Sequence, residues 1–263
     1  MNTRRLFYED VYIKEFEAIV LSCEEKDGKY YVILNETAFY PEGGGQPADK
    51  GTIENIPVVD VQYVDGELCH IMESPLEEGA QVVGRIDWDW RFDLMQQHSG
   101  EHIVSGMIHE KYGYENVGFH MGEEVITIDL SGMLNWQQVQ EIENKVNNYI
   151  WTNQQVNIFY PDERQRKLIP FRSKKELTGE IRLVEFPGAD LCACCGLHVT
   201  HASQIGLVKI LSCKKFRDGV RLEMLSGKRA LNYLSSSTEQ NSQVAVSLSV
   251  KEKETKDAVQ RLL

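Results

Sequence analysis

Two pairs of side chains that can bind a metal ion lie far apart in the sequence, and each pair has the same spacing of four residues. The first pair is His98 and His102, and the second is Cys194 and His198. Residues four apart in a helix lie on one face, a turn apart, so both imidazoles of the first pair can reach one ion. Thiolate and imidazole ligands suit Zn²⁺, and two such pairs fill its four tetrahedral positions. The pattern therefore predicts a zinc site.

Neighbouring residues leave alternatives to this ligand set open. Cys192, Cys195 and His201 lie in the same segment as the second pair and compete with it as ligands. Two histidines at helical spacing also occur on solvent-facing helix surfaces, and a lone buried cysteine is often only a small hydrophobic residue. A zinc protease is not indicated, because its motif needs Glu directly after the first histidine, where this chain has Ser99.

A glycine-rich segment, Phe39-Tyr-Pro-Glu-Gly-Gly-Gly-Gln46, is the third feature that can carry chemistry. Consecutive glycines allow positive φ and let a backbone approach a ligand closely. A nucleotide-binding P-loop is not indicated, because no Gly-Lys-Ser/Thr follows. We expect Gly44 and Gly45 to contact substrate, Gln46 to contact a carbonyl or a water, and the hydroxyl of Thr37 to face the same pocket. A plain flexible turn is the alternative.

The charge distribution bears on the kind of partner. The chain has 263 residues and a formal net charge of −12, which by itself argues against nucleic acid. The acidic excess lies before residue 161, however, whereas residues 161–230 carry an excess of lysine and arginine. This stretch can approach phosphates, and we expect Lys174 and Lys175 within it to bind substrate. A solvated charged surface is the alternative.

Local patterns indicate which elements position these residues. Residues 8–90 contain short β-rich runs, such as 30–34 and 58–64, with turn signals at Asp27-Gly28 and Asp65-Gly66, which predicts a small barrel. Apolar residues at helical spacing predict helices over 91–109 and 136–151. Strands are predicted over 124–130, 181–186, 205–211 and 219–225. Without a regular βαβ rhythm, this mixture predicts an α+β fold.

Cysteine usage and hydropathy indicate the compartment. Of six cysteines, three crowd into positions 192–195, and the N-terminus lacks the apolar core of a secretory signal. Metal or thiol chemistry in a reducing compartment is therefore favoured over a disulfide framework. No apolar run approaches membrane-spanning length, so we expect a cytoplasmic protein without a membrane partner.

The glycine-rich loop, the HxxxH helix and the CxxxH segment, in this order and approximate spacing, resemble the editing domain of alanyl-tRNA synthetases. They resemble the free-standing alanyl-tRNA editing (AlaX) proteins even more closely, over about residues 5–230. The resemblance implies a small N-terminal β-barrel, then an α+β editing core of the threonyl/alanyl-tRNA synthetase second additional domain type, then a C-terminal helix. It also implies zinc held by His98, His102, Cys194 and His198, with Thr37 and Gln46 near the aminoacyl group.

The activity that this resemblance implies is hydrolysis of tRNA(Ala) mischarged with serine or glycine. An alanine pocket discriminates poorly, by roughly 10–200-fold for a methylene-sized difference and about a hundredfold for an added hydroxyl, so a second hydrolytic site is useful. A zinc-stabilised tRNA-binding module without hydrolysis and a zinc hydrolase of another small ester or amide are alternatives. The family often has Cys-Gly-Gly-Thr-His where this chain has Cys195 and Leu197, which bears on substrate preference.

We expect three regions along the chain. Residues 1–90 form the β-barrel domain with the glycine-rich loop, residues 91–230 the zinc-binding editing core, and residues 231–263 the start of a C-terminal helical segment. Residues 250–263 contain no Gly or Pro stop signal. We therefore expect the helix to continue in a longer native chain, which forms a homodimer through a C-terminal region absent from this one.

Overall fold

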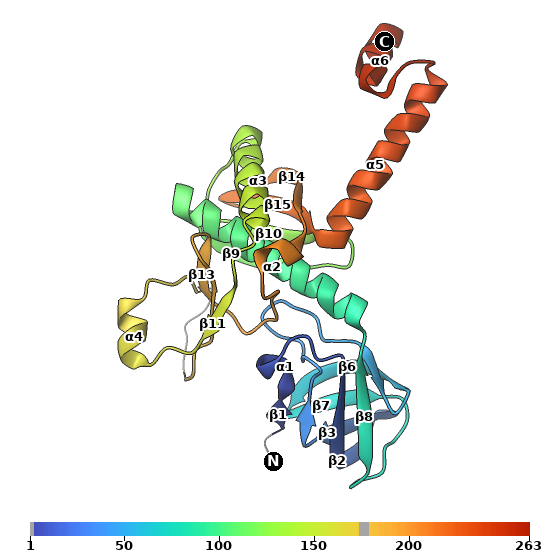
Figure 1. Ribbon diagram of the computed structural model, residues 1–263, viewed down its shortest axis with the longest axis vertical. Coiled ribbons are helices and arrows are strands. Elements are labelled where there is room, and N and C mark those ends of the chain that lie inside the picture. Colours follow the sequence, from blue (N-terminus) through green and yellow to red (C-terminus); the bar gives the residue numbers. More distant parts are fainter. Residues whose placement is uncertain (1–2, 174–178) are drawn as a thin grey trace.

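The computed structural model describes residues 3–173 and 179–263. A β-barrel formed by the N-terminal residues lies at one end, a mixed α+β core lies in the middle, and a helical arm extends from the core at the other end (Figure 1). Helix α2 (Trp88–Tyr112) leads from the barrel into the core. The fold therefore has the predicted α+β class with an N-terminal barrel.

Six antiparallel strands close the barrel. Their order is β2 (Glu15–Lys26), β3 (Lys29–Leu34), β7 (Glu67–Met72), β6 (Ile56–Val64), β5 (Gly51–Ile53) and β8 (Gln81–Ile86), which pairs again with β2. Buried side chains alternate with exposed ones along β2, as expected for strands with one face on a core. The two predicted turns join β2 to β3 and β6 to β7, with positive φ at both residues of Asp27-Gly28 and of Asp65-Gly66.

A small appendage lies at the start of the chain. Strand β1 (Arg4–Arg5) pairs in parallel with β4 (Glu36–Thr37), and the short helix α1 (Leu6–Glu9) follows β1. The Tyr8 hydroxyl on α1 donates a 2.8 Å hydrogen bond to the carbonyl oxygen of Cys195. The appendage therefore contacts the segment that holds the second predicted ligand pair.

Helix α2 is the joint between the barrel and the core. Asp87 caps its N-terminus by accepting a hydrogen bond from the backbone N–H of Trp90, and Gly113 ends it in a left-handed conformation. The helix extends three residues beyond each predicted end. Arg91 in its first turn is completely buried and pairs with the buried Asp49 of the barrel. One continuous hydrophobic cluster also runs through both regions.

Two sheets and a helix form the core around α2. The four-stranded antiparallel sheet has the order β14 (Val208–Phe216), β15 (Gly219–Ser226), β10 (Ile126–Leu130) and β9 (Asn116–Met121). The three-stranded sheet has the order β11 (Asn157–Phe159), β12 (Leu183–Phe186) and β13 (Asp190–Ala193). Helix α3 (Trp136–Trp151) matches its predicted range, and the short helix α4 (Glu163–Leu168) follows β11.

The predicted strand over 205–211 is only partly correct. Residues Ala202–Ile205 form a 3₁₀ turn, and β14 begins at Val208 and continues to Phe216. The turn is held by hydrogen bonds around the side chain of Gln204, whose amide oxygen accepts from the backbone N–H groups of Thr200 and His201. A periodicity argument does not detect such a side-chain bond, because it reads only apolar spacing.

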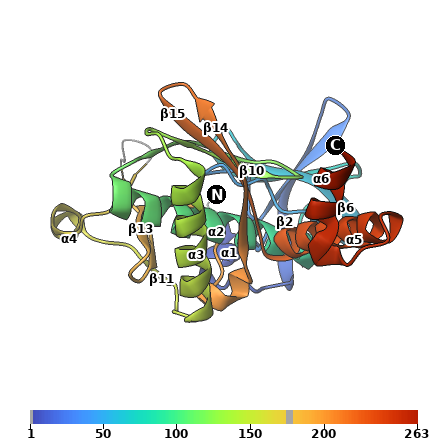
Figure 2. The same ribbon diagram turned by 90° about the horizontal axis from the view of Figure 1, so that it is seen from above.

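The C-terminal arm is a helix followed by a break. Helix α5 (Gly227–Ser247) leaves the core on the side opposite α4 (Figure 2). It ends with Ser249 at a φ of 55°, and the N–H of Val250 bonds to the carbonyl of Ala245. This is the usual left-handed helix ending, with serine in the place of glycine. A turn at Glu252–Glu254 and the helix α6 (Thr255–Leu262) follow, so the C-terminal segment consists of two helices with a break between them.

The predicted boundaries between regions fall close to helix starts. The 90/91 boundary lies in the first turn of α2, and the 230/231 boundary lies in the first turn of α5. These boundaries stay predictions. None of the helices among the described residues is long and apolar enough to cross a membrane.

Candidate metal centre

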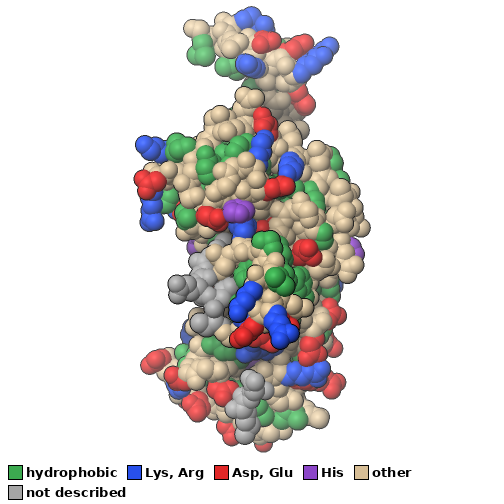
Figure 3. All heavy atoms as spheres, turned by 90° about the vertical axis from the view of Figure 1, so that its left-hand side faces the viewer, with side chains coloured by type: hydrophobic (Ala, Val, Ile, Leu, Met, Phe, Trp, Pro, Cys, Tyr) green, Lys and Arg blue, Asp and Glu red, His purple; other side chains and the backbone are tan. Residues whose placement is uncertain are grey.

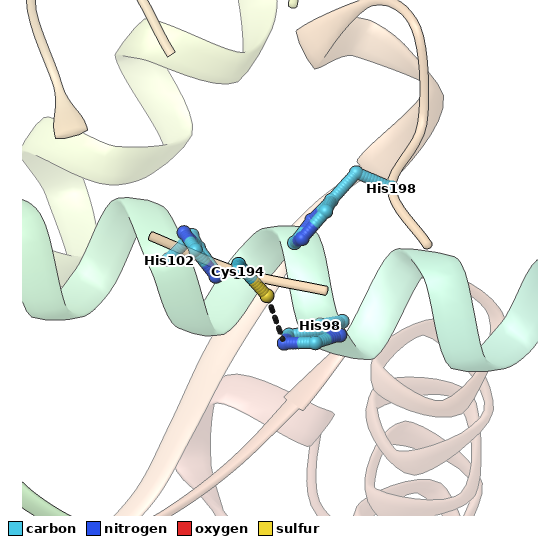
Figure 4. A group of neighbouring side chains, drawn as sticks. All are labelled: His98, His102, Cys194 and His198. Carbon is cyan, nitrogen blue, oxygen red and sulfur yellow. Dashed lines mark hydrogen bonds between the residues drawn. The ribbon is translucent and has the colours of Figure 1, made fainter. Parts of the chain in front are cut away.

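The four predicted ligands meet at one point in the core. His98 and His102 come from α2, Cys194 directly follows β13, and His198 lies four residues further along the same loop. Their side chains converge (Figure 4), and one ligand atom from each lies within 4.8 Å of the other three. The sulfur of Cys194 lies 3.5 Å from Nε2 of His98. The structure thus brings together two pairs that are about 90 residues apart in sequence.

His98 is oriented by the glycine-rich loop. Its Nδ1 lies 3.0 Å from the side-chain oxygen of Gln46, which also accepts a 3.0 Å hydrogen bond from the backbone N–H of Leu197. Since that N–H can only donate, the oxygen of Gln46 is an acceptor, and Nδ1 of His98 carries the proton. Any side chain at Gly196 would collide with the His98 ring, 2.1 Å from a Cβ there. Nε2 of His98 is left facing the cluster.

His102 is oriented by a buried carboxylate. Its Nδ1 lies 2.9 Å from Asp190, whose carboxylate is held on the other side by two hydrogen bonds of 2.7 and 3.0 Å from Arg172. A Cβ at Gly106 would lie 2.3 Å from the carbonyl oxygen of Ala189, so only glycine lets this strand approach the helix. The carboxylate and the arginine fix the ring of His102 with its Nε2 toward the cluster.

His198 completes the pattern. Its Nδ1 lies 3.2 Å from the hydroxyl of Ser99, and that hydroxyl also accepts from the backbone N–H of Val199. The Nε2 atom of His198 is buried and has no hydrogen-bond partner among the described residues. A buried polar atom without a partner is costly unless something else satisfies it. All three imidazoles therefore direct the nitrogen that can bind metal at the same point.

The residues at this point fit a zinc ion. With ligand bonds of about 2.3 Å for sulfur and about 2.0–2.1 Å for nitrogen, a tetrahedral site places the two kinds of ligand about 3.6 Å apart. The 3.5 Å between Cys194 and His98 agrees with that value. Ligating histidines normally donate their other ring N–H to a carboxylate, carbonyl or similar acceptor, as all three do here. The donor set and its hydrogen-bonded surroundings therefore form a candidate metal-binding site that zinc fits.

The electrostatics of the cluster favour a thiolate. Burial by itself raises the pKa of Cys194, but the neighbouring His98 and His102 imidazoles lower it well below its ordinary value. Burial lowers the pKa of His198, and the nearby imidazoles lower it further, so this ring stays neutral. A thiolate and a neutral imidazole are the forms that bind zinc.

The structure separates the competing cysteines. The thiol of Cys195 is exposed and lies 3.8 Å from the hydroxyl of Tyr40. Cys192 is buried on β13, and burial raises the pKa of its thiol. It belongs to a second possible group with His102 and Asp190, but Arg172 already neutralises that carboxylate. Cys194 is therefore the thiol that lies with all three histidines.

The glycine-rich loop packs tightly against the cluster. The backbones of Gly43 and Gln46 bond to each other in both directions, at 3.1 and 3.0 Å. Gly44 and Gly45 have positive φ, and a Cβ would lie 2.9 Å from the sulfur of Cys195 at the first and 2.7 Å from the Phe119 ring at the second. That ring in turn stacks on His98 at 5.5 Å. The loop is thus a close-fitting wall of the site.

Thr37 is not a member of the ligand cluster. Its hydroxyl is completely buried in the barrel, 2.8 Å from Nε2 of His70, and accepts a hydrogen bond from the backbone N–H of Phe39. Nδ1 of His70 lies 3.1 Å from the carbonyl oxygen of Val32 and therefore carries the proton. Burial lowers the pKa of His70 to about 4, so the ring is neutral and accepts the Thr37 proton. The sequence had suggested no role for His70.

The remaining predicted residues have simple positions. Lys174 and Lys175 lie outside the described residues. His201 lies 3.2 Å from the hydroxyl of Thr200 and is not part of the cluster. Sequence reasoning missed the roles of Asp190, Arg172 and Ser99. Asp190 and Ser99 are polar residues near a ligand pair in the sequence, which is a signal for a supporting role. The histidine that each of them contacts is visible only in the fold.

Two family models match the chain where the barrel and the metal loop lie. The first, described as class II (A) tRNA synthetases, matches residues 6–90, and the second matches residues 181–222. The second is the threonyl and alanyl tRNA synthetase second additional domain, and it includes Cys194 and His198. Together, these matches show that two parts of the chain resemble parts of tRNA synthetases.

Individual relatives identify the family. The chain is 33% identical to alanyl-tRNA editing protein AlaX-L of Pyrococcus horikoshii over 87% of its own length and 59% of the relative's. It is 32% identical to alanyl-tRNA editing protein Aarsd1 of Danio rerio over 96% and 66%. It is 37% identical to the alanine–tRNA ligase of Ignicoccus hospitalis over 86% of this chain but 26% of the ligase. The chain belongs to the alanyl-tRNA editing protein family and spans about a quarter to two thirds of these relatives.

Proposed function

We propose that this chain hydrolyses tRNA(Ala) mischarged with serine, and with glycine as a second substrate. Water cleaves the ester, and the products are the free amino acid and a tRNA with a free hydroxyl at its 3′ end. The observation that carries the proposal is the His98–His102–Cys194–His198 cluster with its outer nitrogens anchored, in a chain of an editing family. The relatives are alanyl-tRNA editing proteins, which supports alanyl-tRNA as the substrate.

We propose zinc as the resident metal, held by Cys194 and the three histidines. When bound there, it supplies a Lewis acid that polarises the ester carbonyl or lowers the pKa of a bound water to about 7. The three histidines are buried, whereas Cys194 is partly exposed. The substrate therefore approaches from the side of Cys194, where α1 and the glycine-rich loop lie.

Gln46 is the proposed contact to the ester. Its oxygen is fully used by His98 and Leu197, and its Nε2 is buried without a hydrogen-bond partner among the described residues. A free amide N–H₂ group beside the metal cluster is a donor for a carbonyl oxygen on which negative charge develops. Gly44 and Gly45 support this role because their lack of side chains lets the loop lie against the cluster.

Thr37 is the proposed residue for amino-acid selectivity. Its hydroxyl donates to His70 and accepts from Phe39, which leaves one lone pair free. That lone pair can accept a hydrogen bond from the hydroxyl of serine, and alanine has no group to offer it. The hydroxyl of Thr37 is fixed before substrate arrives, because both of its other bonds are buried.

Basic side chains near the metal loop are the proposed contacts to the tRNA backbone. Helix α4 carries Arg164, Arg166 and Lys167, and none of its side chains is buried. Blue and green side chains lie together on the face of the molecule to which α4 belongs (Figure 3). We propose that Lys174 and Lys175, which lie outside the described residues, also contact the tRNA backbone.

A zinc-stabilised tRNA-binding module without hydrolysis is the second candidate. The observation that favours it is the number of protein ligands, because four fill a tetrahedral site and a catalytic zinc keeps one position open. The free Nε2 of Gln46 favours the enzyme instead. The two candidates make opposite predictions for a single assay.

The experiment measures deacylation of Ser-tRNA(Ala), Gly-tRNA(Ala) and Ala-tRNA(Ala) by the whole chain, with Gln46→Ala as the test variant. We expect the first two substrates to be hydrolysed and the third to be spared. Zinc bound at full occupancy without hydrolysis of any substrate would identify the binding module. Hydrolysis of simple esters but of none of the three tRNAs would identify a hydrolase of another ester.

A further inference from the structure

Three tyrosines and two arginines from distant parts of the chain meet beside the loop that holds Cys194 and His198. We call them the tyrosine–arginine cluster, and its members are Arg5, Tyr8, Tyr63, Tyr160 and Arg182. None of them is a predicted ligand, and the proposed mechanism uses none of them. Such a group of rings and cations on a largely acidic chain calls for a separate explanation.

Two members are bonded directly to the loop. The hydroxyl of Tyr8 donates to the carbonyl oxygen of Cys195 at 2.8 Å. One terminal nitrogen of Arg182 donates to the carbonyls of Cys194 and Gly196 at 2.8 and 2.9 Å, and its guanidinium lies 5.0 Å from the centre of the Tyr8 ring. The cluster is therefore fixed relative to the metal-binding thiol.

The other members extend the cluster to the surface. Tyr63 and Tyr160 are 46% and 47% exposed, and both lie close enough to Tyr8 to add to the effect of burial in raising the pKa of its phenol. The guanidinium of Arg5 lies 5.6 Å from the centre of the Tyr63 ring. Two half-exposed rings thus lie in the neighbourhood of a third that bonds to the metal loop.

The two arginines of the cluster carry positive charge that the described carboxylates do not pair. Among the described residues, no carboxylate forms a salt bridge with Arg5 or Arg182. The Nε of Arg182 is buried without a hydrogen-bond partner in the same part of the chain. Elsewhere in the structure, arginines form salt bridges with carboxylates, as Arg4 does with Glu9. Among the described residues, the cluster therefore combines two half-exposed aromatic rings with an exposed Arg5 and a buried Arg182 that no carboxylate pairs, which suits a polyanion with flat bases.

We propose that the tyrosine–arginine cluster binds the unpaired nucleotides at the 3′ end of a tRNA by stacking their bases on Tyr63 and Tyr160, with Arg5 beside the phosphates. The inference rests on the proposed function and deepens it. Aromatic side chains bind single-stranded RNA with little regard to sequence, because every base has a π-face. The esterified nucleotide must reach the metal from the side of Cys194, so the nucleotides before it pass over this cluster.

The experiment uses two uncharged RNA helices with the acceptor-stem sequence of tRNA(Ala). One keeps its single-stranded 3′ end, and the other is trimmed to a blunt end. Dissociation constants are measured by fluorescence anisotropy at one fixed salt concentration for the whole chain and for Tyr63→Ala and Tyr160→Ala. Tyr63→Phe and Tyr160→Phe keep the ring, and Tyr233→Ala removes a ring of similar exposure, 44%, from α5.

We expect the unaltered chain to bind the helix with the single-stranded end more tightly, and each alanine variant to lose about 5- to 100-fold of that affinity, as for one lost stack. Blunt-end binding should not change, and the Phe variants and Tyr233→Ala should bind both helices normally. Equal affinity of the unaltered chain for the two helices would overturn the proposal. So would alanine variants that keep the preference.

The two proposals fail separately, because the RNA in this test carries no amino acid. Preference for the single-stranded end without any deacylation supports the stacking surface and rejects the enzyme. Deacylation with unchanged KM in both alanine variants rejects the stacking surface and leaves the enzyme in place. Metal content measured on each variant shows whether the loop beside the cluster is intact.

Discussion

The replacement Asp190→Asn tests how the metal centre is held together. The Asp190 carboxylate is almost completely buried between Nδ1 of His102 and the guanidinium of Arg172. Asparagine keeps the shape but removes the charge that both partners require. We therefore expect weaker zinc binding and a less stable metal-free protein from the same substitution.

The two effects have different sizes. Loss of an acceptor behind a ligating histidine typically reduces metal affinity 10- to 100-fold, which is about 1.4–2.7 kcal/mol. The side chain of Arg172 is only 9% exposed, so the variant leaves a buried cation without its anion. Removing one partner of a buried pair costs about 3–5 kcal/mol. The loss of stability should therefore exceed the loss of metal-binding free energy.

A matched control is Asp129→Asn, which breaks a similar pair between β10 and β15 that includes none of the four ligands. Asp129 bonds to Arg221 at 2.6 and 2.8 Å, but that arginine side chain is 37% exposed. Exposed pairs contribute about 0–1 kcal/mol. Zinc affinity is measured by competition with a chelator, and stability by urea unfolding of the metal-free proteins. Equal losses in the two variants, or full zinc affinity in Asp190→Asn, would refute the reasoning.

Three further outcomes follow from the described contacts. The double replacement His98→Ala, His102→Ala should abolish zinc binding, whereas full zinc in metal analysis would show that the ligands lie elsewhere. Thr37→Val should narrow the preference for Ser-tRNA(Ala) over Ala-tRNA(Ala) about ten- to a hundredfold with unchanged zinc content. An unaltered ratio of the two deacylation rates would show that this hydroxyl does not recognise the serine side chain. Because the folded pKa of His70 is lowered from 6.5 to about 4, its neutral form stabilises the fold fully above pH 6.5, and this stability is lost as the pH falls toward 4. The free energy of unfolding should fall by about 2 kcal/mol between pH 7 and pH 5 for this reason. Urea unfolding of His70→Asn should lack this part of the pH dependence. The same pH dependence in the variant and in the unaltered chain would contradict the prediction.

The sequence was sufficient where periodicity and spacing determine structure. The barrel turns at Asp27-Gly28 and Asp65-Gly66 were predictable because two-residue hairpins need residues that accept positive φ. Helix α3 was predictable from its apolar stripe. Two ligand pairs with the same spacing indicated one metal centre because a tetrahedral ion needs four donors.

The sequence was insufficient where one side chain bonds to a distant one. Asp190 and Gln46 bond to two histidines of one helix from distant parts of the chain, and only the fold defines these contacts. The break at Ser249 escaped prediction because serine gives no stop signal, although it adopts the conformation that glycine usually supplies. The hydroxyl of Thr37 was expected in the substrate pocket, and its bond to His70 could not be foreseen because the two lie on different strands.

The contact between Gln46 and His98 makes the barrel and the core thermodynamically linked. Gln46 belongs to the loop of the barrel, His98 belongs to the helix of the core, and the pair of Asp49 with Arg91 anchors one to the other. The barrel favours metal binding through this hydrogen bond. Because such coupling is reciprocal, metal binding stabilises the docking of the barrel on the core by the same free energy. Removal of zinc should therefore loosen the contact between the two regions as well as the site itself.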